Sequence, residues 1–432
     1  MGCTNSKNMN ILMVKNPMGG KKRAQPQTKI WLMEMLSAYC EGDKKYGEPN
    51  TWDVTLVTDM SNLFEDMKTF NEPIDQWDTS QVTDMNRMFM GASAFNQPIA
   101  MDTSQVTDMS SMFQGASAFN QPVSEINTSH VTNMSSMFMG ALAFNQPLAM
   151  DTSQVTNMSS MLKNAPSFNQ PVKLDTSQVT NMSSMFQMVD SAGASLFNQP
   201  IDMDTSQVTN MSCMFWNASS FNQPIDMDTS EVTDMSCMFM KASSFNQPID
   251  MDTSQVTDMS RMFQGASAFD QPITMDTLHV TNMSCMFQGA SAFDQPITMD
   301  TSHVTNMSSM FEGASAFNQP LQMFTWKVTN MSSMFKDASS FNQPLTRDYG
   351  KGRKAFDTAK VTNFSRMFEG ASSFNQPITM NMRFAKNMEC MFCDASSFNQ
   401  SLMALNDMMH TASKQQDFKG ATALEERHLR LL

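Results

Sequence analysis

The chain has 432 residues and a net charge of −14 at pH 7. An acidic balance of this size argues against nucleic acid as a partner, because phosphate contacts need a basic face. No stretch approaches the roughly 20 apolar residues that span a bilayer, and the seven cysteines lack the spacing of a disulfide framework, which is typical of reduced intracellular thiols.

The first segment, residues 1–29, forms a basic arm with no acidic residue. Its opening residues, MGCTNSK, match the myristoylation pattern, with Gly2 as the acceptor and Cys3 as a candidate palmitoylation site. They resemble the doubly acylated leaders of eukaryotic signalling kinases. One myristoyl chain binds a membrane only marginally, so Cys3 or the basic residues would supply a second signal. The predicted electrostatic contacts to the membrane are Lys7, Lys15, Lys21, Lys22, Arg23 and Lys29.

This arm predicts a protein attached to the cytoplasmic face of a membrane. The arm lacks the apolar core of a secretory signal peptide, since ILMV at 11–14 is too short. A chance match on a soluble, unstructured arm is the alternative explanation for the acylation pattern. Export to the cell surface by a route that the sequence does not show is the alternative location.

After the arm, residues 30–50 are expected to form an N-terminal helical cap, and residues 51–402 consist of one repeated block. The repeats align on the valine of a VT pair, which gives about 14 units of 24 or 25 residues, the last of them degenerate at Ala385. Insertions near 187–195 and at 346–359 interrupt the period. The aligned valines are Val57, Val82, Val106, Val131, Val155, Val179, Val208, Val232, Val256, Val280, Val304, Val328 and Val361.

Each unit is predicted to contain one short helix and one short strand. In the unit of Val106, apolar residues at 109, 112, 113 and 116 have the spacing of one helix face, and Asp108 precedes them as an N-cap. A short strand is expected through the following PIxMDT segment. The asparagine after each phenylalanine, as at Asn96 and Asn120, is expected to bond the turn backbone and its copy in the next unit.

Such a unit cannot bury its own apolar face, so the copies are expected to stack into an α/β repeat fold, a right-handed solenoid like a leucine-rich repeat. The segment WDTSQVTDMNRMFMGASAFNQPI, residues 77–99, resembles the repeat of the BspA-like bacterial surface protein family, and the resemblance covers residues 30–402. It implies that solenoid and an uncharacterised adhesion-type or surface module. Most units depart from the family by carrying methionine, as at Met101 and Met150, where Trp52 and Trp77 keep its tryptophan.

The last segment, residues 403–432, lacks the repeat and is predicted to form a C-terminal helical cap or tail. Within the second insertion, Arg347, Lys351, Arg353 and Lys354 make a basic island on an otherwise acidic rod, which is a candidate contact site.

Three sets of residues share columns of the alignment and are candidate chemical sites. His130, His279 and His303 share a column with Gln, Glu and Lys and are expected at the surface; a metal shared by His279 and His303 is left open. Cysteines 213, 237, 285 and 390 share a column with arginines and are expected to be exposed, and an oxidised link between Cys213 and Cys237 is left open. Paired aspartates at 202/204, 226/228 and 250/252 are interpreted as a solvated strip, with weak Ca²⁺ binding left open.

The CxxC pair Cys390 and Cys393 has no second pair and no thioredoxin-like context, and the fifty methionines are interpreted as core. No catalytic residue, resident metal or cofactor is predicted, and an enzyme is disfavoured. The leading hypothesis is a monomeric, non-enzymatic solenoid that presents an acidic Ser/Thr-rich surface to a protein partner, tethered to a membrane by its acylated arm. The alternative is an extracellular adhesion or ligand-binding module of the BspA-like type.

Overall fold

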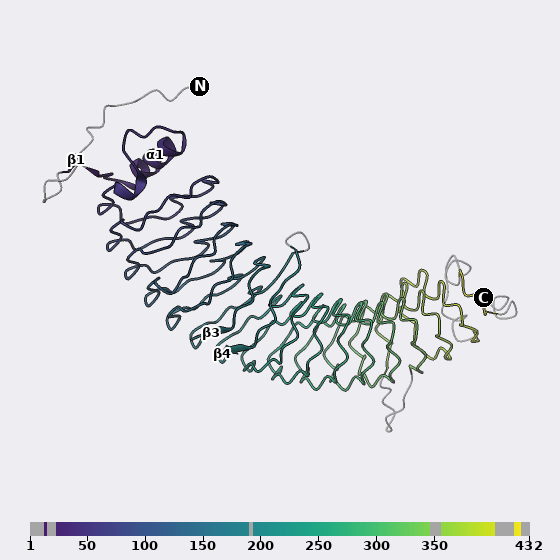
Figure 1. The fold of residues 1–432 in the computed structure, drawn as a ribbon. Coiled ribbons are helices and arrows are strands. Elements are labelled where there is room, and N and C mark those ends of the chain that lie inside the picture. The colour runs from purple at the N-terminus through teal and green to yellow at the C-terminus, as the bar shows by residue number, and fades with distance from the viewer. Residues whose placement is uncertain (1–12, 15–22, 190–192, 346–355, 402–418, 425–432) are drawn as a thin grey trace. The chain divides into compact units, whose positions relative to one another are not determined.

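The structure is a computed structural model that describes residues 13–14, 23–189, 193–345, 356–401 and 419–424. The chain divides into two compact units, Met1–Gln178 and Val179–Leu432. In each unit the repeats follow one another as stacked coils (Figure 1). The first unit contains strands β1 (Met13–Val14) and β2 (Arg23–Ala24), helix α1 (Lys29–Cys40), the 3-10 helix η1 (Pro49–Thr51) and strand β3 (Val172–Leu174); the second contains strand β4 (Ile201–Met203).

Helix α1 precedes the first coil, and its ends are defined by local chemistry. The Thr28 hydroxyl accepts a hydrogen bond from the Trp31 N–H at 3.2 Å, which satisfies one of the free donors of the first turn. At the other end Gly42 adopts φ 93° and donates to the Tyr39 carbonyl, which stops the helix. The helix buries Trp31, Leu32, Met35, Leu36 and Tyr39. Before it, β1 pairs with β2 in antiparallel orientation.

The two tryptophans of the repeat alignment lie at this end of the first unit. The Trp52 indole N–H donates to the Tyr46 carbonyl at 2.9 Å, and that of Trp77 donates to the Pro49 carbonyl at 2.8 Å. Both side chains are buried. They therefore fix the loop that leads from α1 into the coils.

Parallel one-residue bridges join successive coils at the Asp or Asn that follows each VT pair. We call these positions the bridge column. In the first unit it contains Asp59, Asp84, Asp108, Asn133 and Asn157, and in the second Asn181, Asn210, Asp234, Asp258, Asn282, Asn306, Asn330, Asn363 and Asn387.

The predicted helix in each repeat is wrong: among the described residues α1 is the one α-helix, and the coils are built from turns. Asp108 does accept a backbone N–H, from Ser110 at 2.8 Å, but it closes an Asx turn and caps no helix. The backbone then becomes left-handed at Ser111, with φ 56°, and again at Gly115, with φ 70°. Two left-handed residues within one helical turn are incompatible with an α-helix.

Alternate amides serve different partners along this segment, which we call the turn ribbon (the bridge residue and the seven residues after it). The N–H groups of Met109, Ser111, Phe113 and Gly115 donate to carbonyls of the next coil at 2.7–3.1 Å. The N–H groups of Met112 and Gln114 donate backward by three residues, Met112 to Met109 at 3.2 Å, and that of Ser110 donates to the Asp108 side chain. Every amide from Met109 to Gly115 is therefore satisfied, four between coils and three within the coil.

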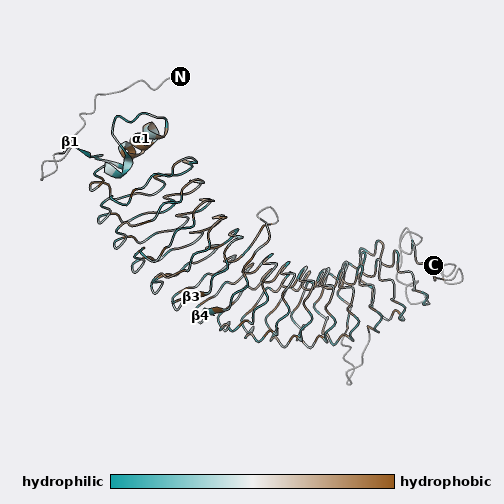
Figure 2. Cartoon of the chain, viewed as in Figure 1, coloured by the Kyte–Doolittle hydropathy of each residue, from teal (hydrophilic) through white to brown (hydrophobic). Residues whose placement is uncertain are grey.

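The interior consists of aligned columns of Val, Met, Phe and Ala, most of them fully buried. Two columns of phenylalanine stack in face-to-face order: in the first unit Phe113 lies 4.0 Å from Phe119 within its coil and 5.7 Å from Phe138 in the next, measured between ring centroids. Figure 2 shows hydrophobic and hydrophilic positions alternating around the coils. The interpretation of most methionines as core is confirmed, since methionines such as Met109, Met112 and Met134 are fully buried.

Two polar ladders run between coils beside this core. Buried threonines donate to a carbonyl of the next coil, as Thr103 does to Asn127 at 2.9 Å. Asn96 accepts from the Asn120 N–H at 3.0 Å and from the Gln121 side chain at 3.1 Å, and its equivalents repeat this pattern. The predicted asparagine ladder is confirmed.

The predicted strand segment is extended only in places. It forms β3 and β4, and in the second unit single-residue bridges join Ile249, Ile273, Ile297 and Leu321. The predicted C-terminal cap lies outside the described residues apart from 419–424, and so does most of the second insertion. No helix among the described residues is long and apolar enough to cross a membrane.

Candidate functional site

Most of the predicted lipidation and membrane-contact residues, namely Gly2, Cys3, Lys7, Lys15, Lys21 and Lys22, lie outside the described residues. Arg23 is exposed in β2. Lys29 has a partner in the protein: its Nζ lies 3.1 Å from the Asp59 carboxylate and also bonds Ser61. Burial alone would raise the pKa of Asp59, but hydrogen bonds from Ser61 and Lys29 outweigh burial and lower it. Lys29 therefore holds α1 against the first coil.

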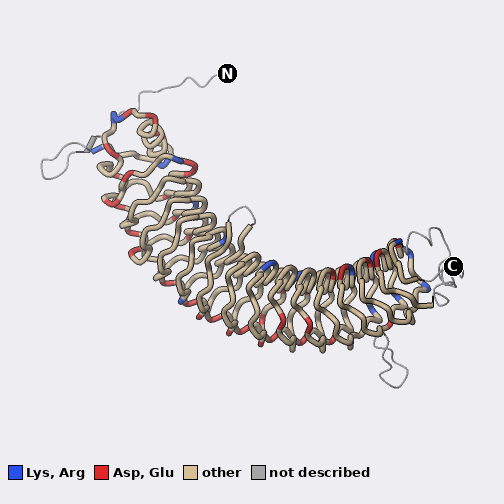
Figure 3. The backbone as a smooth tube through the Cα atoms, turned by 45° about the vertical axis from the view of Figure 1, so that its right-hand side comes forward, with Lys and Arg blue, Asp and Glu red and all other residues tan. Residues whose placement is uncertain are grey.

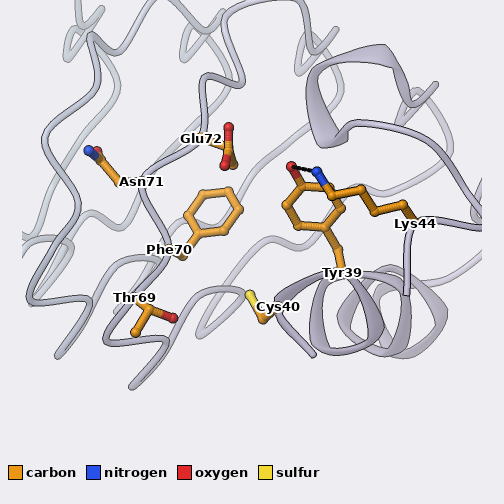
Figure 4. A pocket seen from close by; sticks show the side chains of 7 residues that line it. All are labelled: Tyr39, Cys40, Lys44, Thr69, Phe70, Asn71 and Glu72. Carbon is orange, nitrogen blue, oxygen red and sulfur yellow. Dashed lines mark hydrogen bonds between the residues drawn. The ribbon is translucent and has the colours of Figure 1, made fainter. Parts of the chain in front are cut away.

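A cavity of about 230 Å³ lies between α1 and the segment 69–72 of the first coil (Figure 4). Tyr39, Cys40 and Lys44 line one side, and Thr69, Phe70, Asn71 and Glu72 line the other. The Lys44 Nζ lies 4.9 Å from the Tyr39 ring centroid and 3.2 Å from Glu48, so its charge is already paired.

Two groups of this cavity, the Tyr39 hydroxyl and the Cys40 thiol, have raised pKa values. Burial raises the pKa of the Tyr39 hydroxyl, and its hydrogen bond to Glu48 raises it further. Burial also raises the pKa of the Cys40 thiol, and the nearby Glu41 and Glu72 carboxylates add to this effect. Both groups stay protonated at neutral pH, so neither is a nucleophile there.

The turn ribbon contains two columns in which the residue type changes from coil to coil, and most of their members are exposed or half-exposed; Gln187 and Cys393 are buried. The left-handed column lies three residues after the bridge column and holds Asn, Arg, Ser or Cys at φ 54–59°. The variable column lies six residues after the bridge column. In the first unit the variable column holds Glu65, Met90, Gln114, Met139 and Lys163, and in the second Gln187, Trp216, Met240, Gln264, Gln288, Glu312, Lys336, Glu369 and Cys393.

The cysteines of the left-handed column are half-buried, which corrects the expectation that they are exposed. Their side chains lie against the same column of the neighbouring coils, which removes part of their surface from solvent. The Cys213 and Cys237 thiols are in hydrogen-bonding contact, and this contact and burial raise the pKa of Cys237. Burial likewise raises the pKa of Cys285, although Arg261 opposes it.

Part of the variable column forms a polar ladder that sequence reasoning missed. In the second unit Gln264 donates to Gln288 at 2.6 Å, and Gln288 donates to Glu312 at 3.0 Å. Lys336 follows, 4.0 Å from Glu312 and 3.5 Å from Glu369. The alignment carries a signal for it, because one column changes from Gln to Glu to Lys to Glu in consecutive coils. Figure 3 shows charges of both signs on these coils.

The histidine column is exposed, as expected at His130, His279 and His303. A ring nitrogen of His279 lies 2.9 Å from the Ser254 carbonyl, and one of His303 lies 3.1 Å from the Ser302 hydroxyl. Across the described residues no group of three or more His, Cys, Asp or Glu side chains is arranged to hold a metal ion.

The second aspartate of each predicted pair has a structural partner. Asp204, Asp228 and Asp252 accept the backbone N–H two residues on, at 2.9–3.0 Å. These hydrogen bonds lower the pKa of each carboxyl; the backbone N–H has the largest effect, and the hydroxyl of the same serine adds to it. These aspartates therefore close turns at the surface, and the first members of the pairs, Asp226 and Asp250 among them, are exposed.

Sequence comparison matches residues 33–150, 100–196, 148–228, 191–299, 273–351 and 346–430 to one family, DUF285, described as a Mycoplasma protein of unknown function. No curated protein matches the chain. Among solved structures the chain is similar to one in "Crystal structure of TLR13-ssRNA13 complex", with 8% identity and a TM-score of 0.25. The match covers 85% of this chain and 65% of that one, so the chain spans just under two thirds of its length. At this TM-score nothing about ligand or activity is transferred.

Proposed function

The chain belongs to the DUF285 family of repeat proteins, and we propose that it is a non-enzymatic scaffold whose turn-ribbon face binds a protein partner. One observation carries the proposal: the buried columns keep their residue types through the array, whereas the left-handed and variable columns change theirs. Packing requires no such change, so the variation is available for recognition.

The chemistry of this face suits a protein partner. Trp216 and Met240 are half-exposed neighbours in the variable column, and aromatic and Met side chains are enriched in protein interfaces. The Gln–Glu–Lys ladder continues the same column with groups that donate and accept hydrogen bonds. The backbone beneath is held by bonds to both neighbouring coils, so little conformational entropy is lost when a partner binds.

The binding test compares two variants. The face variant combines Trp216→Gln and Met240→Gln. Glutamine already occupies this column at Gln114 and Gln264, so the coils should accommodate it. Gln207→Ala with Gln255→Ala changes an exposed column outside the turn ribbon and serves as the matched control. Each purified protein is immobilised and its bound proteins are quantified by mass spectrometry. We expect the face variant to lose partners that the control keeps; equal recovery by both would contradict this assignment of the face.

A membrane tether is the second part of the proposal, with the scaffold attached to the cytoplasmic face of a membrane. The Gly2 and Cys3 pattern and the basic arm support it. The BspA-like resemblance supports the alternative, an extracellular adhesion module. Labelling cells with a myristate analogue, for wild type and Gly2→Ala, separates the two. We expect label on the wild type alone, and an unlabelled wild type found outside the cells would favour the alternative.

A further inference from the structure

Two cysteines of the second unit occupy the left-handed column in neighbouring coils. Cys213 and Cys237 have φ 59° and 58°. The Cys213 N–H donates to the Ser236 carbonyl and the Phe215 N–H donates to the Met238 carbonyl, both at 2.9 Å, so these two coils are held in register beside the pair. Two residues further along the same coils, the rings of Phe215 and Phe239 stack with centroids 5.5 Å apart.

This register brings the two sulfurs within reach of a covalent bond. Hydrogen-bonded neighbouring chains lie about 4.8 Å apart, and disulfides join cysteines whose Cα atoms are roughly 4.4–6.8 Å apart. The thiols already touch through a hydrogen bond. Both residues are half-buried, which leaves them open to a small solute from the turn-ribbon face.

One neighbouring side chain, Arg261, attracts an anionic co-reactant, while the Asp258 carboxylate opposes it. Arg261 occupies the left-handed column of the next coil, and its charge favours the thiolate form of both Cys237 and Cys285. A peptide disulfide that carries carboxylates, such as oxidised glutathione, would be drawn to this cation. Cys285 lies beyond Arg261, one coil further on, and has no cysteine in a neighbouring coil of its column.

We propose that Cys213 and Cys237 form a site of reversible thiol–disulfide exchange with a low-molecular-weight disulfide. One thiol loses its proton to solvent, and its thiolate attacks a sulfur of oxidised glutathione, which releases one glutathione thiolate and leaves a mixed disulfide. The second cysteine, as thiolate, attacks the cysteine sulfur of that mixed disulfide and releases the second glutathione. Two protein thiols are oxidised to one disulfide, and one glutathione disulfide is reduced to two thiols.

The other close pair differs in a way that provides a control. The thiols of Cys390 and Cys393 are also in contact, but Cys393 is only 5% exposed, whereas Cys213 and Cys237 are both half-buried. A disulfide in solution reaches a buried thiol slowly. Exchange is therefore expected at Cys213 and Cys237 before Cys390 and Cys393.

The experiment treats the full chain with oxidised glutathione and maps its cysteines by differential alkylation and mass spectrometry. A tryptic peptide, residues 174–241, contains Cys213 and Cys237 and no third cysteine, and cleavage before aspartate separates the two. We expect a Cys213–Cys237 cross-link at about tenfold higher occupancy than any other pairing, because the second thiol reacts intramolecularly.

Two serine variants complete the test. Serine occupies the same column at Ser184, Ser309 and Ser333, so the substitutions keep a residue that the coil accommodates. Cys237→Ser is expected to abolish the cross-link and retain glutathione on Cys213, whereas Cys285→Ser leaves the cross-link unchanged. Wild-type protein in which Cys213 and Cys237 stay reduced, or in which each retains its own glutathione, would overturn the proposal.

Discussion

At the residue scale, the repeat depends on two left-handed positions in each described turn ribbon, except in the ribbon of Asn181, where only Ser184 is left-handed. The first accepts Ser, Cys, Arg or Asn at φ 54–59°, although this conformation costs such residues roughly 1–2 kcal/mol each. The second is most often glycine, with φ 67–70° in the coils. The cost is offset because left-handed residues such as Ser111 and Gly115 turn their N–H groups toward the next coil, where they donate to carbonyls.

Two glycines with the same torsion separate the backbone cost from the steric cost. Gly289 and Gly370 both have φ 68°, but a Cβ on Gly289 would lie 3.7 Å from its nearest neighbour and one on Gly370 would lie 2.1 Å from a carboxylate oxygen of Asp337. We expect Gly289→Ala to lower the free energy of unfolding by about 1 kcal/mol, and Gly370→Ala to lower it further. Urea unfolding measures both values.

The Asp337 carboxylate provides the control for this comparison. Asp337→Gly removes the carboxylate, so the loss caused by adding Gly370→Ala, measured against Asp337→Gly alone, should equal that of Gly289→Ala in the wild type. Equal losses for the two single alanine variants would show that the close approach of Asp337 has no energetic effect.

At the scale of the element, the turn ribbon explains which parts of the fold the sequence could predict. Spacing at i, i+3, i+4 and i+7 placed Met109, Met112, Phe113 and Ala116 correctly in the core. The same spacing is met by successive tight turns, so the inferred helix was wrong. Bonds that distinguish the two structures, such as Phe113 to Met137 at 2.9 Å, join different coils, and no periodicity within one coil reveals them.

For the Cys213–Cys237 pair and the polar ladder, the sequence likewise predicted which residues are neighbours but not how their side chains are arranged. Alignment alone put Cys213 and Cys237 in neighbouring coils. The prediction that this column is exposed failed because the side chains of one column cover each other. The arginines in the column suggested full exposure, but a long arginine side chain can extend beyond the covered part and still reach solvent. The polar ladder was visible as a change of residue type, but its pairing depends on side-chain conformations.

The contribution of the asparagine ladder can be tested at a single position, Asn246. The Asn246 side-chain oxygen accepts from the Asp270 N–H at 2.9 Å and from the Gln271 side chain at 3.0 Å. Asn246→Ala leaves that half-buried N–H without its acceptor, and we expect a loss of about 1–2 kcal/mol. Amide hydrogen exchange at Asp270 should become faster.

Asn246→Asp is the matched variant, because aspartate fills this role at Asp270, which accepts from the Asp294 N–H at 3.0 Å. It should keep the Asp270 amide protected. Faster exchange in both variants, or in neither, would contradict the role assigned to the side-chain oxygen.

At the scale of the whole molecule, stability is a sum of contacts between neighbouring coils within each unit. Deleting residues 258–281 removes one full period and brings Asn282 into the place of Asp258 beside Asp234. Every column then continues with an equivalent residue. We expect this variant to stay folded, with a thermal midpoint within about 5 °C of the wild type.

The half-period deletion of residues 258–269 is the control. It sets apolar residues against the polar positions of the next coil and should unfold the array locally, with a large fall in the thermal midpoint and the circular dichroism signal. If the full-period deletion were as damaging as this one, stability would not be the sum of neighbour contacts.

The direction of the turn-ribbon bonds has a mechanical consequence. The covalent chain runs around each coil, whereas the hydrogen bonds of Met109, Ser111, Phe113 and Gly115 run from that coil to the next. Tension between the two ends of a unit would therefore load the junctions between coils in series, and the outermost coil, which is bonded to one neighbour only, would give way first. Such a unit would lengthen as its coils detach one after another from the end. After each detachment the remaining coils would still end in a complete coil, onto which the released segment could fold back.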